Sequence, residues 1–451
     1  MGGYTLNPFK FNYKSLPEVQ SRLEELDVYL PLGENTQILT KSLTIGSTTI
    51  PNRMGIAPME GFDSNEDGTP SELARNRYLK YARGGAGLIW FEAVTIVPEG
   101  RSCIRQLALT KENLPAYQRL IDQMRNEGLK KNGYIPYLIM QANHSGRYSR
   151  PNPQASPEPI IAYTHPEIEK IFPVDSSRIA TDDYLEALEE KFGEAAELCK
   201  RAGFDAIDIK SCHGYLLGEL ASAYTREGRY GGSFDNRFRL LLNAVRNAQR
   251  AQSGDFAVTV RLNIYDGFPY PHGFGVAKDG SMTPDYEEPL KLVKILHDDL
   301  HIPMINVTMG DPHITPHVTR PFNADDKFSA PEDPLVGIAR MYEGTAVIKK
   351  ANPGLVISAS APSYLRQFSP NLAAGSIEKG ICDHVCYGRL AFANADFPNQ
   401  IKENGGLNAN NTCTACGKCS SLGRAGMAAG CVVRDTRTYL PLYKELARKN
   451  G

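Results

Sequence analysis

Short, mostly apolar runs recur through the middle of the sequence, and segments with helical spacing separate them. The runs occupy residues 54–57, 87–91, 134–140, 206–209, 257–262, 304–307, 355–358 and 384–386. Short apolar runs bounded by polar or turn-forming residues are typical of buried β-strands. The pattern therefore predicts eight strands.

Helices are clearest in two of the intervening segments. In residues 182–201 the apolar side chains keep helical spacing behind a Thr181 cap. In residues 236–251 they fall at positions i, i+3, i+4 and i+7. Strands that alternate with helices favour an α/β fold, and eight of them favour a (β/α)8 TIM barrel over a doubly wound sheet.

The regions on either side of the barrel predict two additions to it. A chain of 451 residues is long for one core. Within residues 1–50, the part from 38 to 50 alternates around a Gly-Ser turn and predicts a hairpin that closes the bottom of the barrel. We expect an N-terminal extension over 1–50, the barrel over 51–405 and a C-terminal segment over 406–451.

Three long irregular segments follow predicted strands, at residues 142–180, 263–284 and 308–329. Connections that leave the carboxyl ends of barrel strands meet on one face, which is the catalytic face of this fold. Loops of this length in a compact domain are usually functional. We therefore expect them to border an active site.

Charge and hydropathy exclude several classes of protein. Fifty Lys and Arg residues against 51 Asp and Glu give a net charge of −1, so we expect neither nucleic acid nor an anionic membrane as a partner. The sequence has no apolar run of about 18 residues, and its first residues lack the apolar core of a signal peptide. We expect a cytoplasmic protein.

Four of the nine cysteines lie close together near the end of the sequence, in CTACGKCSSLGRAGMAAGC. They are Cys413, Cys416, Cys419 and Cys431. Zinc usually collects its thiolates as separated pairs, whereas a tight triple with a fourth cysteine is nearer to the four-cysteine sites of 4Fe–4S clusters. The spacing favours a 4Fe–4S cluster in the C-terminal segment, with zinc as the alternative.

Polar side chains follow the fourth predicted strand, where Lys210, His213 and Tyr215 come in quick succession. Barrels build their active sites from residues at such strand ends. If the chain stays extended, His213 and Tyr215 project to the same side, and the pair could grip and protonate one substrate. The alternative is a tyrosine packed under a loop beside a surface histidine.

Other strand ends predict a site for a phosphate and a flavin ring. Small residues around Ser360 follow the seventh strand, and Gly388 with Arg389 follows the eighth, which is where barrels commonly bind phosphate. Gln141 after the third strand and Arg261 at the end of the fifth suit a flavin, because an amide can bind its pyrimidine ring and a cation stabilises its reduced anion. A salt bridge inside the barrel is the alternative for Arg261. No G-x-G-x-x-G motif lies between a strand and a helix, so no Rossmann domain is predicted.

Taken together, these motifs resemble the old yellow enzyme family of FMN-dependent ene reductases over roughly residues 38–435. The sequence is most similar to the barrel part of the iron–sulfur branch, which includes 2,4-dienoyl-CoA reductase, enoate-reductase-like enzymes and trimethylamine dehydrogenase. The segments that carry the resemblance are NRMGIAPM at 52–59, GGAGLIWFEA at 84–93, QANHSGR at 141–147, CHGYLL at 212–217, REGRYGGSFDNRFR at 226–239, VRL at 260–262, YGR at 387–389 and the four cysteines.

The resemblance implies a role for each matching residue. The flavin ring and ribityl chain would be lined by Pro58, Met59, Ala93, Gln141 and Arg261, and the phosphate would be bound by Ser360, Gly388 and Arg389. Tyr215 matches the proton donor and His213 one member of the pair that binds the substrate carbonyl. The four clustered cysteines match the cluster ligands.

Three features depart from the family pattern. Lys210 stands in place of the usual substrate-binding histidine, and its charge favours a carboxylate or a thioester-linked anion. Glu60 stands where a small or neutral polar residue is more common. The relatives continue into a pyridine-nucleotide and FAD module, whereas this sequence ends after a short helical tail over 439–450.

The resemblance implies reduction of an activated C=C bond by hydride from FMN N5, with Lys210 and His213 polarising the carbonyl and Tyr215 protonating the α-carbon. Electrons would come from NAD(P)H or, as we favour, from a partner such as a ferredoxin or a separate flavoprotein. One alternative is amine oxidation with an aromatic cage from Tyr265, Phe268 and Tyr270. Another is an electron-transfer subunit without its own substrate. A homo-oligomer is also expected.

Overall fold

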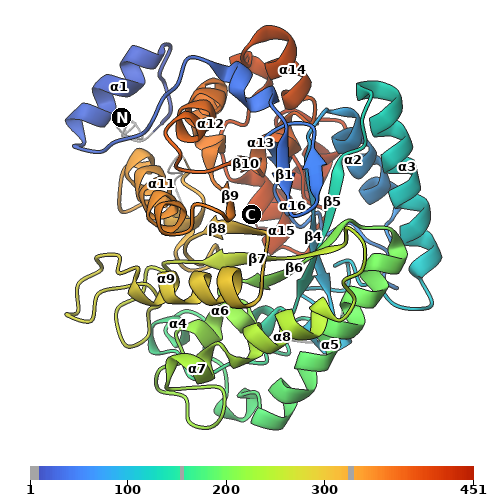
Figure 1. Ribbon diagram of the computed structural model, residues 1–451, viewed down its shortest axis with the longest axis vertical. Coiled ribbons are helices and arrows are strands. Elements are labelled where there is room, and N and C mark those ends of the chain that lie inside the picture. The colour runs from blue at the N-terminus through green and yellow to red at the C-terminus, as the bar shows by residue number, and fades with distance from the viewer. Residues whose placement is uncertain (1–9, 153–156, 323–329, 451) are drawn as a thin grey trace.

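The computed structural model describes residues 10–152, 157–322 and 330–450. Eight parallel strands close into a barrel in the order β10-β3-β4-β5-β6-β7-β8-β9 (Figure 1). They are β3 (Met54–Ile56), β4 (Leu88–Thr95), β5 (Tyr137–Asn143), β6 (Ala206–Ser211), β7 (Ala257–Asn263), β8 (Met304–Thr308), β9 (Val356–Ala359) and β10 (His384–Tyr387). All eight predicted strands are confirmed, and so is the (β/α)8 barrel.

Helices surround the barrel (Figure 1). The longer ones between strands are α2 (Glu72–Arg83), α3 (Leu114–Asn132), α5 (Asp182–Ala202), α8 (Arg239–Gln249), α9 (Glu287–Lys294), α11 (Pro334–Ala351) and α12 (Ser369–Glu378). The others are α1 (Leu16–Glu25), α4 (Pro166–Glu169), α6 (Leu216–Ala221), α7 (Phe234–Arg237), α10 (Pro316–Thr319), α13 (Arg389–Ala393), α14 (Phe397–Asn404), α15 (Lys418–Arg424) and α16 (Tyr439–Asn450). Among the described residues, none of the helices combines the length and apolarity needed to cross a lipid bilayer.

The two helices predicted most clearly are present. The Thr181 hydroxyl accepts a hydrogen bond from the Tyr184 backbone N–H at 3.1 Å, which caps α5 as expected. The segment predicted as one helix over 236–251 is instead α7 followed by α8, because the backbone leaves helical geometry at Phe238. Apolar spacing continues through this break, so periodicity alone does not reveal it.

A small hairpin, β1 (Leu43–Ile45) with β2 (Thr48–Ile50), lies at one end of the barrel. Ile45 and Ile50 are each only 1% exposed. They belong to a separate apolar cluster with residues from inside the barrel, among them Trp90, Ile139 and Met304. The predicted hairpin is confirmed, and it closes the end of the barrel from which the strands start.

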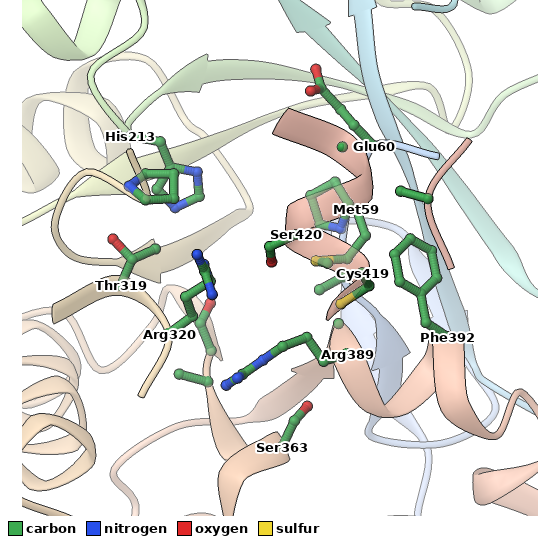
Figure 2. Close-up of a pocket in the computed structure, with 18 of the residues that line it drawn as sticks. Met59, Glu60, His213, Thr319, Arg320, Ser363, Arg389, Phe392, Cys419 and Ser420 are labelled. Carbon is green, nitrogen blue, oxygen red and sulfur yellow. The ribbon is translucent and has the colours of Figure 1, made fainter. Parts of the chain in front are cut away.

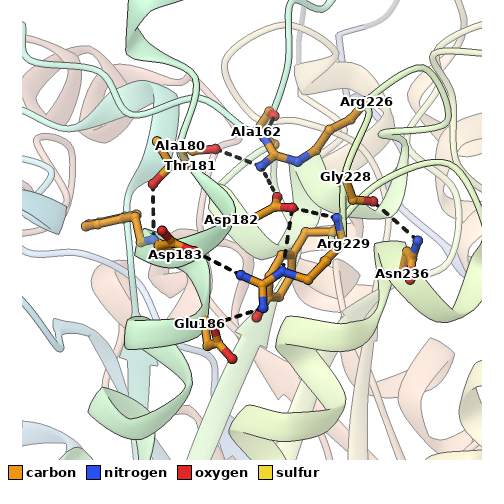
Figure 3. A network of polar contacts seen from close by, with 12 residues as sticks. Ala162, Ala180, Thr181, Asp182, Asp183, Glu186, Arg226, Gly228, Arg229 and Asn236 are labelled. Atoms are coloured by element: carbon orange, nitrogen blue, oxygen red, sulfur yellow. Dashed lines mark hydrogen bonds and ion pairs between the residues drawn. The ribbon is translucent and has the colours of Figure 1, made fainter.

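The segment that follows α6 is tied to the N-terminal end of α5 (Figure 3). Arg226 Nη2 donates to Asp182 Oδ1 at 2.8 Å, and the Arg229 backbone N–H donates to Asp182 Oδ2 at 2.6 Å. The Arg229 guanidinium also reaches Asp183 and Glu186, each at 3.0 Å. These contacts explain the arginines of the REGRYGG segment: they anchor the long connection that leaves β6 and carries the candidate site residues.

The C-terminal segment packs on the barrel through a small apolar cluster of its own. Leu422, Val432 and Tyr439 are buried, and Phe62 from the loop after β3 packs against them. The Ala429 backbone N–H donates to the Gly61 carbonyl at 2.7 Å. The segment therefore lies over the loop that leaves β3. The division into three parts at residues 50 and 405 stays a prediction.

The long connections after β5, β7 and β8 lie where the sequence predicts them, although residues 153–156 and 323–329 of the predicted loops lie outside the described residues. Residues 1–9 of the predicted N-terminal extension are also outside that part of the chain. The described parts of these connections contain only short helices such as α4 and α10.

Candidate active site

A cavity opens at the carboxyl ends of the barrel strands (Figure 2). Nine of the residues predicted to bind cofactor or substrate line it: Pro58, Met59, Lys210, His213, Tyr215, Arg261, Ser360, Gly388 and Arg389. Cys419 lines it too. Ala93 and Gln141 are not among its lining residues, and neither are the other three clustered cysteines.

The chain turns sharply between His213 and Tyr215. β6 ends at Ser211, His213 and Gly214 have positive φ angles of 66° and 69°, and Tyr215 is the N-cap residue of α6. A Cβ atom at position 214 would lie 2.0 Å from Asp311 Oδ2, so this turn requires glycine. The chain is therefore not extended here, so strand alternation does not bring His213 and Tyr215 to one side, but both residues still line the cavity.

Lys210 and Tyr215 contact each other directly. The Lys210 Nζ lies 3.5 Å from the centre of the Tyr215 ring, and both residues are at most 6% exposed. Burial lowers the pKa of Lys210, and the nearby Glu60 carboxylate raises it in part. Burial, together with the charges of Glu60 and Asp311, raises the pKa of Tyr215 well above its usual value. Tyr215 is therefore protonated at neutral pH and able to donate a proton.

His213 lies in the same wall of the cavity. Its Nε2 is 3.1 Å from the Thr308 hydroxyl at the end of β8. Burial, together with the charges of Arg261 and Lys210, lowers the pKa of His213 well below its usual value. The imidazole is therefore neutral at neutral pH, and the contact with Thr308 leaves Nδ1 available to a ligand.

One end of the cavity is strongly cationic. Figure 2 shows the side chains of Arg320 and Arg389 pointing into it beside Ser363. Arg389 is 5% exposed, and its buried Nη1 has no hydrogen-bond partner among the described residues. Burial and the nearby Arg389 and Arg424 lower the pKa of Arg320 to about 9. Buried cations without counter-charges need an anion, so this end fits a phosphate group. Arg320 was not predicted, because a position in an irregular loop gives no signal in the sequence.

The predicted flavin-ring residues are only partly free to bind a ligand. Arg261 Nε is buried and has no partner among the described residues. The Gln141 amide, in contrast, donates to Asp208 Oδ2 on β6 at 2.7 Å. Burial raises the pKa of Asp208 to about 6. The Gln141 amide therefore already has Asp208 as a hydrogen-bond partner. The sequence did not predict this contact.

A buried ionic network supports the loop after β3. Arg77 on α2 binds Asp63 at 2.7 Å and Glu92 on β4 at 2.6 Å, and all three are at most 7% exposed. The second oxygen of Glu92 accepts the Gly61 backbone N–H at 2.8 Å. The network fixes the backbone that follows Pro58, Met59 and Glu60. The sequence did not single out these residues.

The four clustered cysteines lie near one another without being assembled as a metal site. No three Cys, His, Asp or Glu side chains of the described residues are arranged as metal ligands. The thiols of Cys413, Cys419 and Cys431 nevertheless act on one another electrostatically. The Ala415 and Arg434 backbone N–H groups donate to Cys413 Sγ and Cys431 Sγ at 3.3 Å each. Four neighbouring thiols, two of which accept N–H···S contacts, fit the donor set of an iron–sulfur cluster.

The aromatic cage that the alternative of amine oxidation requires does not form at the cavity. Tyr265, Phe268 and Tyr270 are not among its lining residues. The Tyr265 hydroxyl donates to the Met282 carbonyl at 3.0 Å, and Tyr270 packs against Tyr224. Phe268 packs edge-on against His165, so each of the three rings contacts other parts of the protein.

Comparison with known proteins gives a consistent result. The model of the NADH:flavin oxidoreductase / NADH oxidase family matches residues 39–278. An NADH oxidase from Thermoanaerobacter brockii is 28% identical over 376 residues, which cover 82% of this chain and 52% of that protein. A cinnamate reductase from Clostridium sporogenes is 27% identical over 382 residues, covering 82% and 54%. The chain thus spans about half the length of these curated relatives.

Among solved structures, the complex of 2-naphthoyl-CoA reductase with 2-naphthoyl-CoA superposes with a TM-score of 0.71 at 22% identity. The match covers 88% of this chain and 57% of that one. At this identity the match supports the fold alone.

Proposed function

Because the chain belongs to the NADH:flavin oxidoreductase / NADH oxidase family and is an oxidoreductase of the old yellow enzyme type, we propose that it binds FMN in the cavity and reduces an activated C=C bond. The substrate would be an α,β-unsaturated carbonyl compound, acid or thioester. The observation that carries the proposal is that Tyr215, His213 and Lys210 line the same cavity as the cationic pair Arg320 and Arg389. The relative named cinnamate reductase adds support, because cinnamate is an unsaturated acid.

The cavity residues divide the work of binding and proton transfer. Bound FMN would supply the hydride. Lys210, a buried cation, and the neutral His213 would hold the carbonyl oxygen of the substrate and stabilise the negative charge that develops there. Tyr215, which is protonated at neutral pH, would donate its phenolic proton to the α-carbon as a general acid.

The proposal is tested with protein purified without oxygen. The released flavin is identified by chromatography, and the protein-bound flavin is reduced with dithionite and mixed with an enone, an enoate and an enoyl thioester. We expect FMN, and reoxidation by at least one alkene together with formation of the saturated product. Protein without flavin, or reduced flavin that no alkene reoxidises, would contradict the proposal.

We propose that Arg389 binds the FMN phosphate, and we predict that Arg389→Gln weakens FMN binding about 10- to 100-fold, the value of a charged hydrogen bond. The free Nη1 of Arg389 supports this assignment. Kd is measured by flavin fluorescence on the protein stripped of flavin. Riboflavin, which lacks the phosphate, is the control and should bind both proteins equally. If Arg389→Gln weakened the binding of riboflavin as much as the binding of FMN, the assignment would be contradicted.

We also propose that Cys413, Cys416, Cys419 and Cys431 hold a 4Fe–4S cluster, which would supply single electrons. The thiol donor set and its N–H···S contacts support this proposal. We predict that Cys419→Ser removes bound iron and the broad visible absorption of a cluster while flavin is retained. The control is Cys199→Ala, a buried cysteine of α5. Zinc in place of iron in the unaltered protein would show that the prediction of a cluster is wrong.

A second measurement identifies the electron donor. We propose that a ferredoxin or a separate flavoprotein delivers electrons through the cluster, with NAD(P)H as the direct alternative. Rapid mixing of the oxidised protein with NADH, NADPH or reduced ferredoxin distinguishes the two. Flavin reduction by a nucleotide at the rate of turnover would favour the direct route.

A further inference from the structure

Glu60 is the one carboxylate among the residues that line the cavity, within the part of the chain that the structure describes. It follows Pro58 and Met59 in the loop after β3 and is half-buried. Figure 2 shows it at the end of the cavity away from Arg389 and Ser363. Gln106 Nε2 donates to its Oε1 at 3.2 Å. Gln106 therefore holds the Glu60 carboxyl in place at this end of the cavity.

The Glu60 carboxyl lies beside the proposed proton donor. Both side chains line the cavity, and the charge of Glu60 is the largest one that acts on the Tyr215 phenol. The other carboxylate that acts on Tyr215, Asp311, already accepts hydrogen bonds from the Tyr148 hydroxyl and the His313 backbone N–H, both at 2.7 Å. The Lys210 ammonium lies over the face of the Tyr215 ring. Glu60 is thus the acidic group placed to exchange a proton with Tyr215.

Tyr215 needs such a partner in every catalytic cycle. It is 6% exposed, and once it has donated its proton it is left as a buried phenolate. A buried charge of this kind is costly until it is neutralised. Bulk water has little access to it, so a less buried acid that lines the same cavity offers a route for a new proton.

We propose that Glu60 is a proton-relay residue that acts through Tyr215 and returns a proton to it after each turnover. This inference rests on the proposed function. In the step, the O–H bond of the Glu60 carboxylic acid breaks and the phenolic O–H bond of Tyr215 forms, without any change of oxidation state. The resulting Glu60 carboxylate then takes a proton from water or buffer acid at the mouth of the cavity.

The surroundings of Glu60 suit this exchange at neutral pH. Burial raises its pKa to about 7, with Lys210 opposing the shift and Glu92 adding to it. Cys103 also faces Glu60, and the Glu60 charge helps to raise the pKa of its thiol. A carboxyl with a pKa near 7 is present in both forms at the working pH, as a relay requires.

The test compares the first turnover with later ones in Glu60→Gln. Protein with reduced flavin is mixed with excess alkene and a supply of electrons, and flavin oxidation and product are followed. We expect a first turnover within about threefold of the unaltered protein, because Tyr215 begins protonated, followed by a steady rate at least tenfold lower. The dependence of the steady rate on pH near 7 should be lost as well. Glu66→Gln, which removes an exposed carboxylate of the same loop, is the control.

Chemical rescue separates a relay from a structural role. In Glu60→Ala, small carboxylic acids such as acetic acid should restore the steady rate in proportion to their concentration. Equal first and later turnovers in Glu60→Gln, or a first turnover that is slowed as much as the steady rate, would overturn the relay while leaving alkene reduction intact. An unaltered protein that reduces no alkene would overturn the proposed function and the relay with it.

Discussion

Replacing Tyr215 with Phe should slow the reoxidation of reduced flavin by the alkene about 10²- to 10⁴-fold, the usual contribution of a positioned general acid. Reduction of the flavin should proceed at the unaltered rate. The reason is that the substitution removes only the hydroxyl that would donate the proton, while the ring remains under the Lys210 ammonium. The measurement is stopped-flow absorbance of the flavin in the two half-reactions.

The matched control for this substitution is Tyr163→Phe. Tyr163 is also buried and loses a hydroxyl that contacts the Ser222 hydroxyl at 3.1 Å, but it does not line the cavity. We expect both half-reactions of that variant to remain close to those of the unaltered protein. If Tyr215→Phe slowed flavin reduction as much as flavin reoxidation, the assignment of Tyr215 as proton donor would be wrong.

The largest expected effect on stability comes from Arg77→Met, which should lower the free energy of unfolding by about 3–5 kcal/mol at neutral pH. Arg77 is the cation between Asp63 and Glu92, which are at most 1% exposed. Removing it leaves two buried carboxylates, one on β4 and one in the loop after β3, without this counter-charge. The same change should weaken flavin binding, because Glu92 holds the Gly61 backbone beside the cavity.

The loss of unfolding free energy in Arg77→Met should depend on pH. Burial raises the pKa of Glu92, and Arg77 opposes that shift, so removing Arg77 raises the pKa further. A carboxyl whose pKa is higher in the folded state favours folding at low pH and loses that contribution as the pH rises. The difference between variant and unaltered protein should therefore be smaller at pH 5 than at pH 7.

Denaturant unfolding at both pH values measures the difference. Arg83→Met is the control, because Arg83 binds Glu127 at 2.6 Å but is 47% exposed, and such pairs contribute about 0–1 kcal/mol. A cost for Arg77→Met as small as that of the control would show that the buried network contributes little to stability.

Most of the fold could be predicted from the sequence, because each strand is marked by a pattern within its own residues. The strands of a closed barrel bury both faces, so short apolar runs mark all eight of them. Their ends are less certain. β4 was predicted to end at 91 but continues to Thr95, past a shift in register after Trp90. That shift depends on how β4 pairs with β5, and the residues of β4 alone do not indicate this pairing.

The residues of the candidate site also fall into two groups, those that the sequence predicted and those that it did not. Residues placed at strand ends, such as Lys210, Arg261 and Arg389, were predicted because position in the barrel determines where they point. Arg320, Asp208 and the Arg77 network were missed because their roles depend on partners that are distant in the sequence or lie on irregular loops. The turn at Gly214 was missed for a similar reason, since the residue that leaves no room for a side chain there, Asp311, lies on another loop.

The position of α15 has a consequence for how such proteins can be recombined. Cys419, Ser420, Gly423 and Arg424 of this helix line the same cavity as Met59 and Lys210, so the cysteine segment is one of its walls. Phe62, from the loop after β3, also packs against the apolar cluster of the cysteine segment. A chimaera that joins this barrel to the cysteine segment of a relative would therefore have a cavity of altered shape. Only the exchange of both surfaces together, the loop at residues 58–62 with the segment from 413 onward, would preserve the shape of the cavity.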